Sequence, residues 1–133
     1  MIRFENVTKV LSRKTVLDDI SFEVGEGDTF VIVGLSGAGK SVTLQHIVGL
    51  LEPDSGSIFV DGLEVHARKQ RQLQEIREKC GMLFQSGALI NWMNIFDNIA
   101  LPLREKTSMT EKQIADRVHE ALALVELDGV DGK

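Results

Sequence analysis

One short stretch of the sequence has residue types and spacing suited to binding phosphate. It fits the pattern G-x-x-x-x-G-K-[ST] at every fixed position. Its glycines let the backbone turn tightly and approach an anion, because no Cβ stands in the way. Successive backbone N–H groups and the start of a following helix then form an anion cradle. The stretch therefore predicts a phosphate-binding loop made of Gly34, Leu35, Ser36, Gly37, Ala38, Gly39, Lys40 and Ser41.

Two side chains of this stretch add specific chemistry. Lys40 brings a positive charge to the β- and γ-phosphates of a nucleotide, and the Ser41 hydroxyl can occupy one ligand position of octahedral Mg²⁺. The simpler alternative is a glycine-rich turn that matches by accident, at odds on the order of one in a few hundred for a chain this short. The pattern thus favours a nucleoside triphosphate and Mg²⁺ as cofactors.

Such a loop needs a strand before it and a helix after it. The run Thr29–Val33 is apolar and β-branched, which is typical of a strand buried on both faces. Helical spacing after the loop is shown by Leu44, Ile47, Val48 and Leu51. Upstream, Ile2–Leu11 and Thr15–Val24 are predicted to be antiparallel strands joined near Ser12 to Lys14.

Shorter elements are expected downstream. A strand over Ser57–Val60 ends in an Asp61-Gly62 turn, and a polar helix follows over His66–Lys79. A buried strand is predicted over Cys80–Phe84 and a loop over Gln85–Asn94.

Two helices are predicted near the end of the sequence. The first runs from Ile95 to Leu101 and is ended by Pro102. The second begins with a capping box formed by Thr110 and Gln113. Its apolar face is expected to comprise Ile114, Val118, Ala121, Leu122 and Val125.

Composition limits the classes of function. The 133 residues allow one domain or part of one, and the net charge of −5 argues against a nucleic-acid-binding surface. The single cysteine, Cys80, is predicted to be a buried small hydrophobe and cannot form an intrachain disulfide. No apolar stretch reaches the roughly 18 residues of a membrane span, so any membrane role is expected to come through partners. The three histidines, widely spaced in sequence, are expected to be structural or exposed.

Beyond these patterns, the chain resembles the ATP-binding subunit of an ABC transporter. The resemblance rests on "ENVTKVL", "VLDDISFEV", the phosphate loop, "GLLEPDSGSIFVDG" and "GMLFQ", in this order. The stretch "MLFQSGALINWMNIFDNIALPLREKT" is similar to the MlaF/Ttg2A-like branch, the ATPases of MCE-type phospholipid transport systems. The resemblance implies an α/β P-loop NTPase with a parallel core sheet and an N-terminal antiparallel β unit. Residues 1–133 would be the N-terminal part of one nucleotide-binding domain.

This resemblance assigns roles to individual residues. Lys40 would contact the β- and γ-phosphates of ATP, and Ser41 would ligate Mg²⁺. Gln85 would occupy the position of the family's Q-loop glutamine and reach the same Mg²⁺ or the attacking water. Considered without the family, Gln85 is an ordinary exposed loop residue. For the adenine ring, family members commonly use an aromatic residue where this chain has Leu11, with Val16 nearby; plain strand packing explains both residues equally well.

Partners are implied as well. The segment Ser86–Asn94 would receive a coupling helix of the membrane permease, and its apolar residues Leu89, Ile90, Trp92 and Met93 are unusual for a loop. The alternative is that this loop folds onto its own domain. A second ATP-binding subunit would complete a homodimer, and an MCE-type lipid-binding protein would associate indirectly. The implied location is cytoplasmic, on the inner face of the inner membrane.

The family's signature sequence, Walker B strand with its catalytic glutamate, and switch histidine are expected downstream of residue 133. We therefore expect negligible ATP hydrolysis by these residues alone. Two other function classes stay open: a soluble ABC-type ATPase acting in translation or DNA repair, and a small-molecule kinase. The apolar residues of Leu89–Met93 disfavour the first, and the two strands before the phosphate loop disfavour the second.

Overall fold

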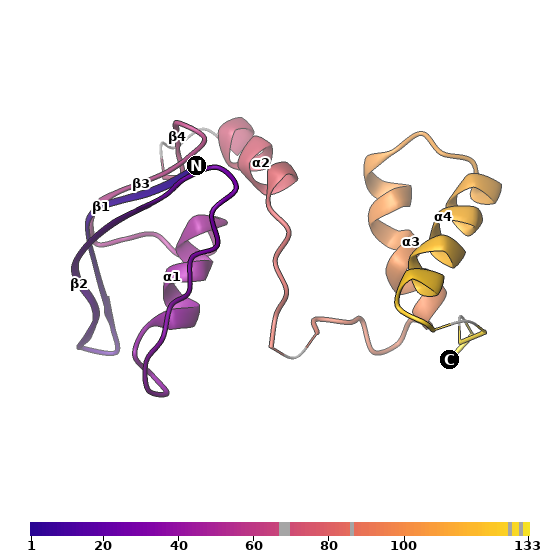
Figure 1. Ribbon diagram of the computed structural model, residues 1–133, viewed down its shortest axis with the longest axis horizontal. Coiled ribbons are helices and arrows are strands. Elements are labelled where there is room, and N and C mark those ends of the chain that lie inside the picture. Colours follow the sequence, from indigo (N-terminus) through magenta and orange to yellow (C-terminus); the bar gives the residue numbers. More distant parts are fainter. Residues whose placement is uncertain (67–69, 86, 128, 131) are drawn as a thin grey trace. The chain divides into compact units, whose positions relative to one another are not determined.

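A four-stranded sheet in the order β2-β1-β3-β4 forms the framework of the first part of the chain. The computed structural model describes residues 1–66, 70–85, 87–127, 129–130 and 132–133, which divide into two units, Met1–Met82 and Leu83–Lys133. The first unit contains β1 (Ile2–Leu11), β2 (Lys14–Val24), α1 (Lys40–Ile47), β3 (Ser55–Val60), β4 (Leu63–Glu64) and α2 (Gln70–Lys79). The second contains α3 (Ile95–Lys106) and α4 (Glu111–Leu124) (Figure 1).

The predicted antiparallel β unit is confirmed. β1 pairs with β2 on one side, with Phe4 opposite Phe22, and with β3 on the other. Ser12 and Arg13 link β1 to β2 with φ values of 49° and 64°, the positive values that a tight two-residue hairpin turn requires. The expected turn at Asp61 and Gly62 likewise has positive φ at both residues and joins β3 to β4.

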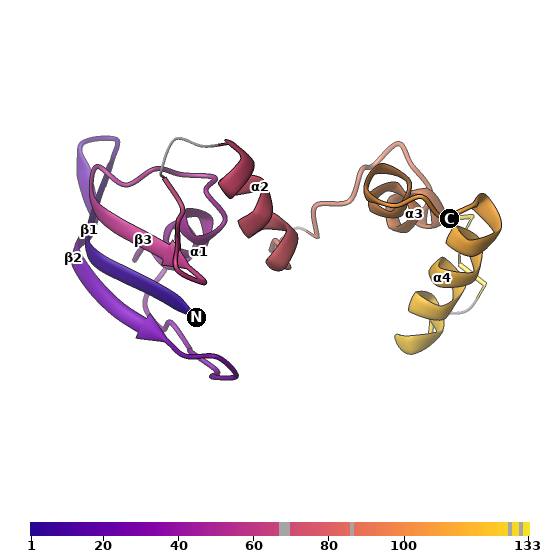
Figure 2. The same ribbon diagram turned by 90° about the horizontal axis from the view of Figure 1, so that it is seen from above.

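One face of this sheet carries the core of the first unit. The buried side chains include Phe4, Val7, Leu17 and Ile58, and the Phe4 and Phe22 rings stack with centroids 4.4 Å apart. Helix α1 packs beside β3, as Figures 1 and 2 show. Burial of large apolar side chains, at roughly 25 cal/mol per Å², thus fixes the sheet against the helix that follows the phosphate loop.

Two strand predictions are wrong for the structure as described. Neither Thr29–Val33 nor Cys80–Phe84 joins a ladder, and all pairings among the described strands are antiparallel. Val31 is 71% exposed and Leu83 is 89% exposed, so these runs are not buried on both faces. Composition predicts the tendency to form a strand, but a ladder also needs a partner strand, which local sequence does not provide.

The second unit is a pair of packed helices. Ala100 of α3 is buried with Ile114, Val118 and Leu122 of α4. Ala121 and Val125, predicted for the same face, are exposed. The capping box is confirmed, since the Thr110 side chain accepts from the Gln113 amide while the Gln113 side chain accepts from the Thr110 amide.

Helix α3 does not end at Pro102, as the sequence predicts, but continues to Lys106. Proline removes one backbone hydrogen bond from a helix interior, a cost of about 3 kcal/mol. Contacts beyond it offset that cost: Leu103 packs against the α3–α4 core. Arg104 then donates to Asp97 at 2.8 Å and to Glu111 at 2.9 Å, which joins the two helices.

The polar helix predicted over His66–Lys79 is α2, although residues 67–69 of that prediction lie outside the described residues. Cys80 is half-buried against the first core. Within the described parts of both units, no helix has the length and apolar character needed to cross a membrane.

Candidate phosphate-binding site

Residues Gly34–Ser41 form a compact turn that leads directly into α1. The Ala38 amide donates to the Leu35 carbonyl at 3.2 Å, and Gly37 has a φ of 78°. Gly39, with a φ of 92°, occupies the N-cap position of α1. These positive φ values are readily adopted only by glycine, so the glycine spacing of the motif follows from the backbone path.

The N-terminus of α1 is suited to an anion. No side chain caps it, and its first turn contains no acidic residue. The first N–H groups of a helix lack intrahelical partners and carry a partial positive charge of about half a unit. The sequence thus builds a helix start whose charge and donors match a phosphate group.

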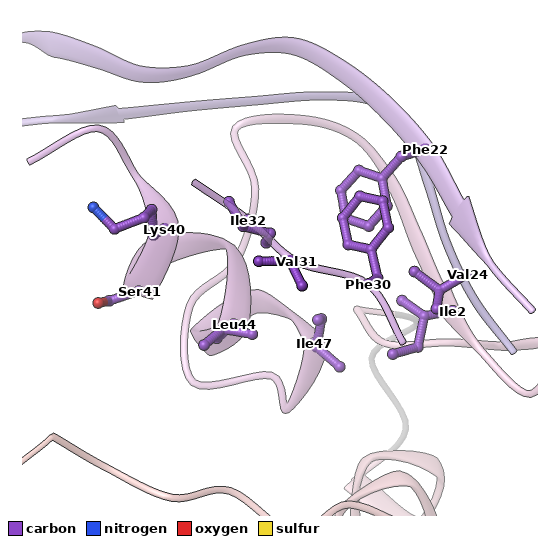
Figure 3. A pocket seen from close by; sticks show the side chains of 10 residues that line it. All are labelled: Ile2, Phe22, Val24, Phe30, Val31, Ile32, Lys40, Ser41, Leu44 and Ile47. Atoms are coloured by element: carbon purple, nitrogen blue, oxygen red, sulfur yellow. The ribbon is translucent and has the colours of Figure 1, made fainter. Parts of the chain in front are cut away.

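Lys40, the first residue of α1, reaches back over the loop. Its ammonium group donates to the carbonyl oxygens of Gly34 and Leu35, at 2.8 Å each. The charge is therefore held at the loop rather than extended into solvent. Figure 3 shows the Lys40 and Ser41 side chains projecting together from the start of α1.

Close packing against β2 fixes the position of the loop. A Cβ on Gly39 would lie 2.8 Å from Leu17 Cδ2 and 2.9 Å from the Val16 carbonyl oxygen. Only glycine allows this approach. Val16, a predicted adenine contact, is thus brought beside the loop, while Leu11 is half-buried at the end of β1 opposite Lys14. The role of both residues toward a base stays a prediction.

An apolar cavity of about 590 Å³ lies beside the site. Lys40 and Ser41 line it together with Leu44 and Ile47 of α1, and Phe30 stacks on Phe22 at 4.9 Å (Figure 3). Its apolar lining is unsuited to a triphosphate. The candidate phosphate-binding groups are instead the backbone and side chains of the loop itself.

Gln85 lies in the second unit, where it is exposed. The Gly87 amide donates to the Phe84 carbonyl at 2.9 Å and closes a turn around it. The Gly34–Ser41 loop and Gln85 therefore belong to different units. The contact of Gln85 with Mg²⁺ stays a prediction.

The sequence predicts that Ser86–Asn94 meets a permease. The structure describes Gly87 to Asn94 of this segment, and Ser86 lies outside the described residues. Leu89 is 65% exposed and Trp92 is 88% exposed. Ile90 and Met93 are half-buried. Two of the four apolar side chains are thus exposed, whereas the other two are only partly exposed.

Three residues with structural roles near these sites escaped the sequence interpretation. Arg77 of α2 donates to the carbonyls of Val48 and Gly49 at 3.0 Å each, which caps the C-terminal end of α1. The buried Thr43 hydroxyl donates to the Gly39 carbonyl. Asn98 bonds to the backbone of the Gly87–Asn94 loop. A polar residue on a helix face gives no sequence signal for such contacts.

Two histidines that are distant in sequence meet in the first unit. The rings of His46 and His66 have centroids 6.3 Å apart in an edge contact. His46 Nδ1 lies 2.7 Å from the Val42 carbonyl oxygen, so that nitrogen must carry the hydrogen. The Nε2 atom of each ring is buried and has no hydrogen-bond partner among the described residues.

Stability of the first unit is expected to fall as the pH drops below about 6.5. Burial lowers the pKa of His66. The nearby carboxylates of Glu52 and Glu64 raise this pKa, whereas His46 and Lys9 lower it further. The folded state therefore binds this proton less readily than the unfolded state, and stability is lost as the pH falls through the folded pKa. Urea unfolding of His66→Gln between pH 7.5 and 5.5 should show a smaller loss than the unchanged chain. An equal loss in both proteins would contradict this origin.

The comparisons with known proteins identify the class. A family model described as ABC transporter matches residues 17–133. The chain belongs to the ABC transporter ATP-binding family, and the expected P-loop ATPase fold is confirmed.

Individual relatives agree with this family. The probable ribonucleotide transport ATP-binding protein mkl of Mycobacterium bovis is 42% identical over 132 residues, which cover 99% of this chain and 37% of that protein. The methionine import ATP-binding protein MetN of Desulfitobacterium hafniense is 42% identical, covering 96% of this chain and 38% of that protein. The chain thus spans less than two fifths of each of these relatives.

Solved structures show the same fold. The dimeric structure of a bacterial ABC transporter cassette matches with a TM-score of 0.88 and 30% identity, covering 100% of this chain and 60% of that one. A dimeric post-hydrolysis state of an ATP-binding cassette, bound to ADP and Pi, matches with a TM-score of 0.87 and 29% identity, covering 99% and 60%. These comparisons do not single out the MlaF-like branch.

Proposed function

We propose that the protein binds the triphosphate of ATP with Mg²⁺ at Gly34–Ser41 and acts as the ATP-binding subunit of an ABC transporter. The main observation in support of this proposal is that the Lys40 ammonium group is held over a glycine turn at the uncapped start of α1. Backbone N–H groups would bind phosphate oxygens, Lys40 would neutralise their charge, and Ser41 would ligate the metal. When bound, Mg²⁺ would supply charge neutralisation at the β- and γ-phosphates.

In this proposal, residues 1–133 are the N-terminal part of one nucleotide-binding domain, located on the cytoplasmic face of the inner membrane. A second ATP-binding subunit is the expected dimer partner, in agreement with the dimeric cassettes of similar fold. Hydrolysis in the complete protein would further involve Gln85.

The membrane partner is proposed to dock on the exposed apolar surface formed by Leu89 and Trp92. The sequence has no charged residue between Lys79 and Asp97, although 26% of all residues are charged. An apolar helix of a membrane subunit matches such a surface, and tryptophan is a frequent anchor in interfaces.

The transported substrate is proposed to be phospholipid, with an MCE-type protein as an indirect partner. This proposal rests on the resemblance of residues 82–107 to the MlaF-like branch. The names of the relatives instead describe ribonucleotide transport and methionine import, so cargoes of those classes are the competing outcomes.

A double substitution of Leu89 and Trp92 by aspartate is expected to release the membrane subunit. The measurement is co-purification, in detergent, of the full-length protein with the multi-span subunit encoded beside its gene. Leu124→Asp is the matched control, because Leu124 is also an exposed leucine, at 81%, but lies on α4.

Retention of the subunit by the double variant would refute the docking surface. Co-purification of an MCE-type protein with the unchanged complex would support the lipid assignment, and its absence would refute that assignment alone. The absence of any membrane subunit would favour the soluble ABC-type ATPase.

A further inference from the structure

The loop with Leu89 and Trp92 is tied to α3 by one side chain. Asn98, in the first turns of α3, extends its amide toward the loop backbone. Its Oδ1 accepts from the Ile90 amide at 2.7 Å. Its Nδ2 has two hydrogens and donates to three carbonyls, those of Asn94 at 2.9 Å, Met93 at 3.1 Å and Ile90 at 3.2 Å, so one hydrogen is shared between two acceptors. One side chain therefore contacts backbone at both ends of the five residues Ile90–Asn94.

The chemistry of these contacts requires an asparagine amide. Three carbonyl oxygens surround Nδ2 and an N–H group faces Oδ1, so the reverse orientation would place oxygen against oxygen. An aspartate would offer no donor to the three carbonyls. A serine hydroxyl would be too short to reach backbone on both sides.

The exposed part of the loop has no comparable apolar anchor. Trp92 is 88% exposed, so burial of its indole ring contributes little to holding the segment. Ala88 adopts a φ of 53°, a conformation that an alanine rarely adopts without support from its surroundings. The half-buried Ile90 and Met93 and the bond from the Met93 amide to the Ile90 carbonyl, at 3.0 Å, contribute to the order of this loop. The Asn98 amide adds four contacts to its backbone.

We propose that Asn98 is the positioning residue of the docking surface: it holds Ile90–Asn94 in the single arrangement that presents Leu89 and Trp92 to an apolar helix of the membrane subunit. This inference rests on the proposed docking function. A loop ordered before binding loses less conformational entropy on association, so releasing it weakens binding without removing any contact side chain.

The test measures the ¹⁵N order parameter of the Trp92 backbone amide in the chain of residues 1–133. This chain contains one tryptophan, so its single indole N–H signal serves as a reference. We expect roughly 0.85 in the unchanged chain and below about 0.6 in Asn98→Asp. Asn94→Ala is the matched control. It removes the helix cap that the Asn94 side chain provides to the Asp97 amide at 2.7 Å but leaves all four Asn98 contacts. It should keep Trp92 ordered.

An unchanged order parameter in Asn98→Asp, with α3 and α4 intact, overturns the inference. Should that variant unfold the second unit, Asn98→Ser gives the same comparison without a charge. In the full-length protein, Asn98→Asp should reduce co-purification of the membrane subunit about tenfold, and Asn94→Ala should leave it unchanged.

These outcomes separate the inference from the proposed function. If the Leu89 and Trp92 double variant releases the membrane subunit but Asn98→Asp retains it, the positioning role is wrong and the docking surface stands. If the double variant retains the subunit, the docking function itself is wrong, and the inference falls with it.

Discussion

Lys40→Ala is expected to weaken binding of ATP with Mg²⁺ by about 100-fold, close to 3 kcal/mol. The ammonium group lies 2.8 Å from two loop carbonyls and is the only charged group that the Gly34–Ser41 stretch provides. Its removal takes away the one protein charge at the loop and leaves the phosphates to the helix start and Mg²⁺, and hydrogen bonds that involve a charged group are among the strongest in proteins. Calorimetric titration of the full-length protein measures the change.

Lys112→Ala is the control for a general loss of positive charge, because Lys112 is exposed on α4 in the other unit. It should bind nucleotide as the unchanged protein does. Equal affinity in Lys40→Ala and Lys112→Ala would show that the Lys40 ammonium group does not hold the phosphates.

Gly56→Ala is expected to destabilise the first unit by about 3–4 kcal/mol. Gly56 lies in β3 with a φ of +85°, and a Cβ there would overlap the backbone carbonyls of Glu5 and Asn6 in β1. These atoms belong to the main chain of the central pairing, where β1 is irregular between Glu5 and Thr8. The clash is relieved only if the strands separate. Urea unfolding followed by circular dichroism measures the loss.

Gly62→Ala isolates the contribution of the clash. Gly62 has a similar φ of +77°, but a Cβ there would meet no atom within 4 Å. Only the strain of a left-handed residue should remain, roughly 1–2 kcal/mol. If the two substitutions cost the same, close approach of β1 to β3 is not what requires glycine at position 56.

The phosphate loop could be predicted because its signal is local. Positive φ at Gly37 and Gly39 and a lysine at the start of a helix are all encoded within eight neighbouring residues. The β1–β2 hairpin and the Thr110 capping box were predictable for the same reason, since each depends on residues close in sequence.

The failures concern contacts between distant residues. Thr29–Val33 has the composition of a buried strand but no ladder partner in the described structure. Pro102 is a strong local stop signal, yet packing of Leu103 and the Arg104 ion pairs carry α3 past it. The side-chain contacts of Asn98 join segments whose spacing follows no repeating pattern.

The most direct test of phosphate binding by the Gly34–Ser41 backbone is a ¹H–¹⁵N titration of the labelled full-length protein with ATP and Mg²⁺. We predict the largest amide shifts at Gly37, Gly39, Lys40 and Ser41, which lie in the turn and the first residues of α1, and small shifts there with AMP. Nucleotide binding that leaves these four amides unmoved, or equal shifts with AMP, would contradict the account.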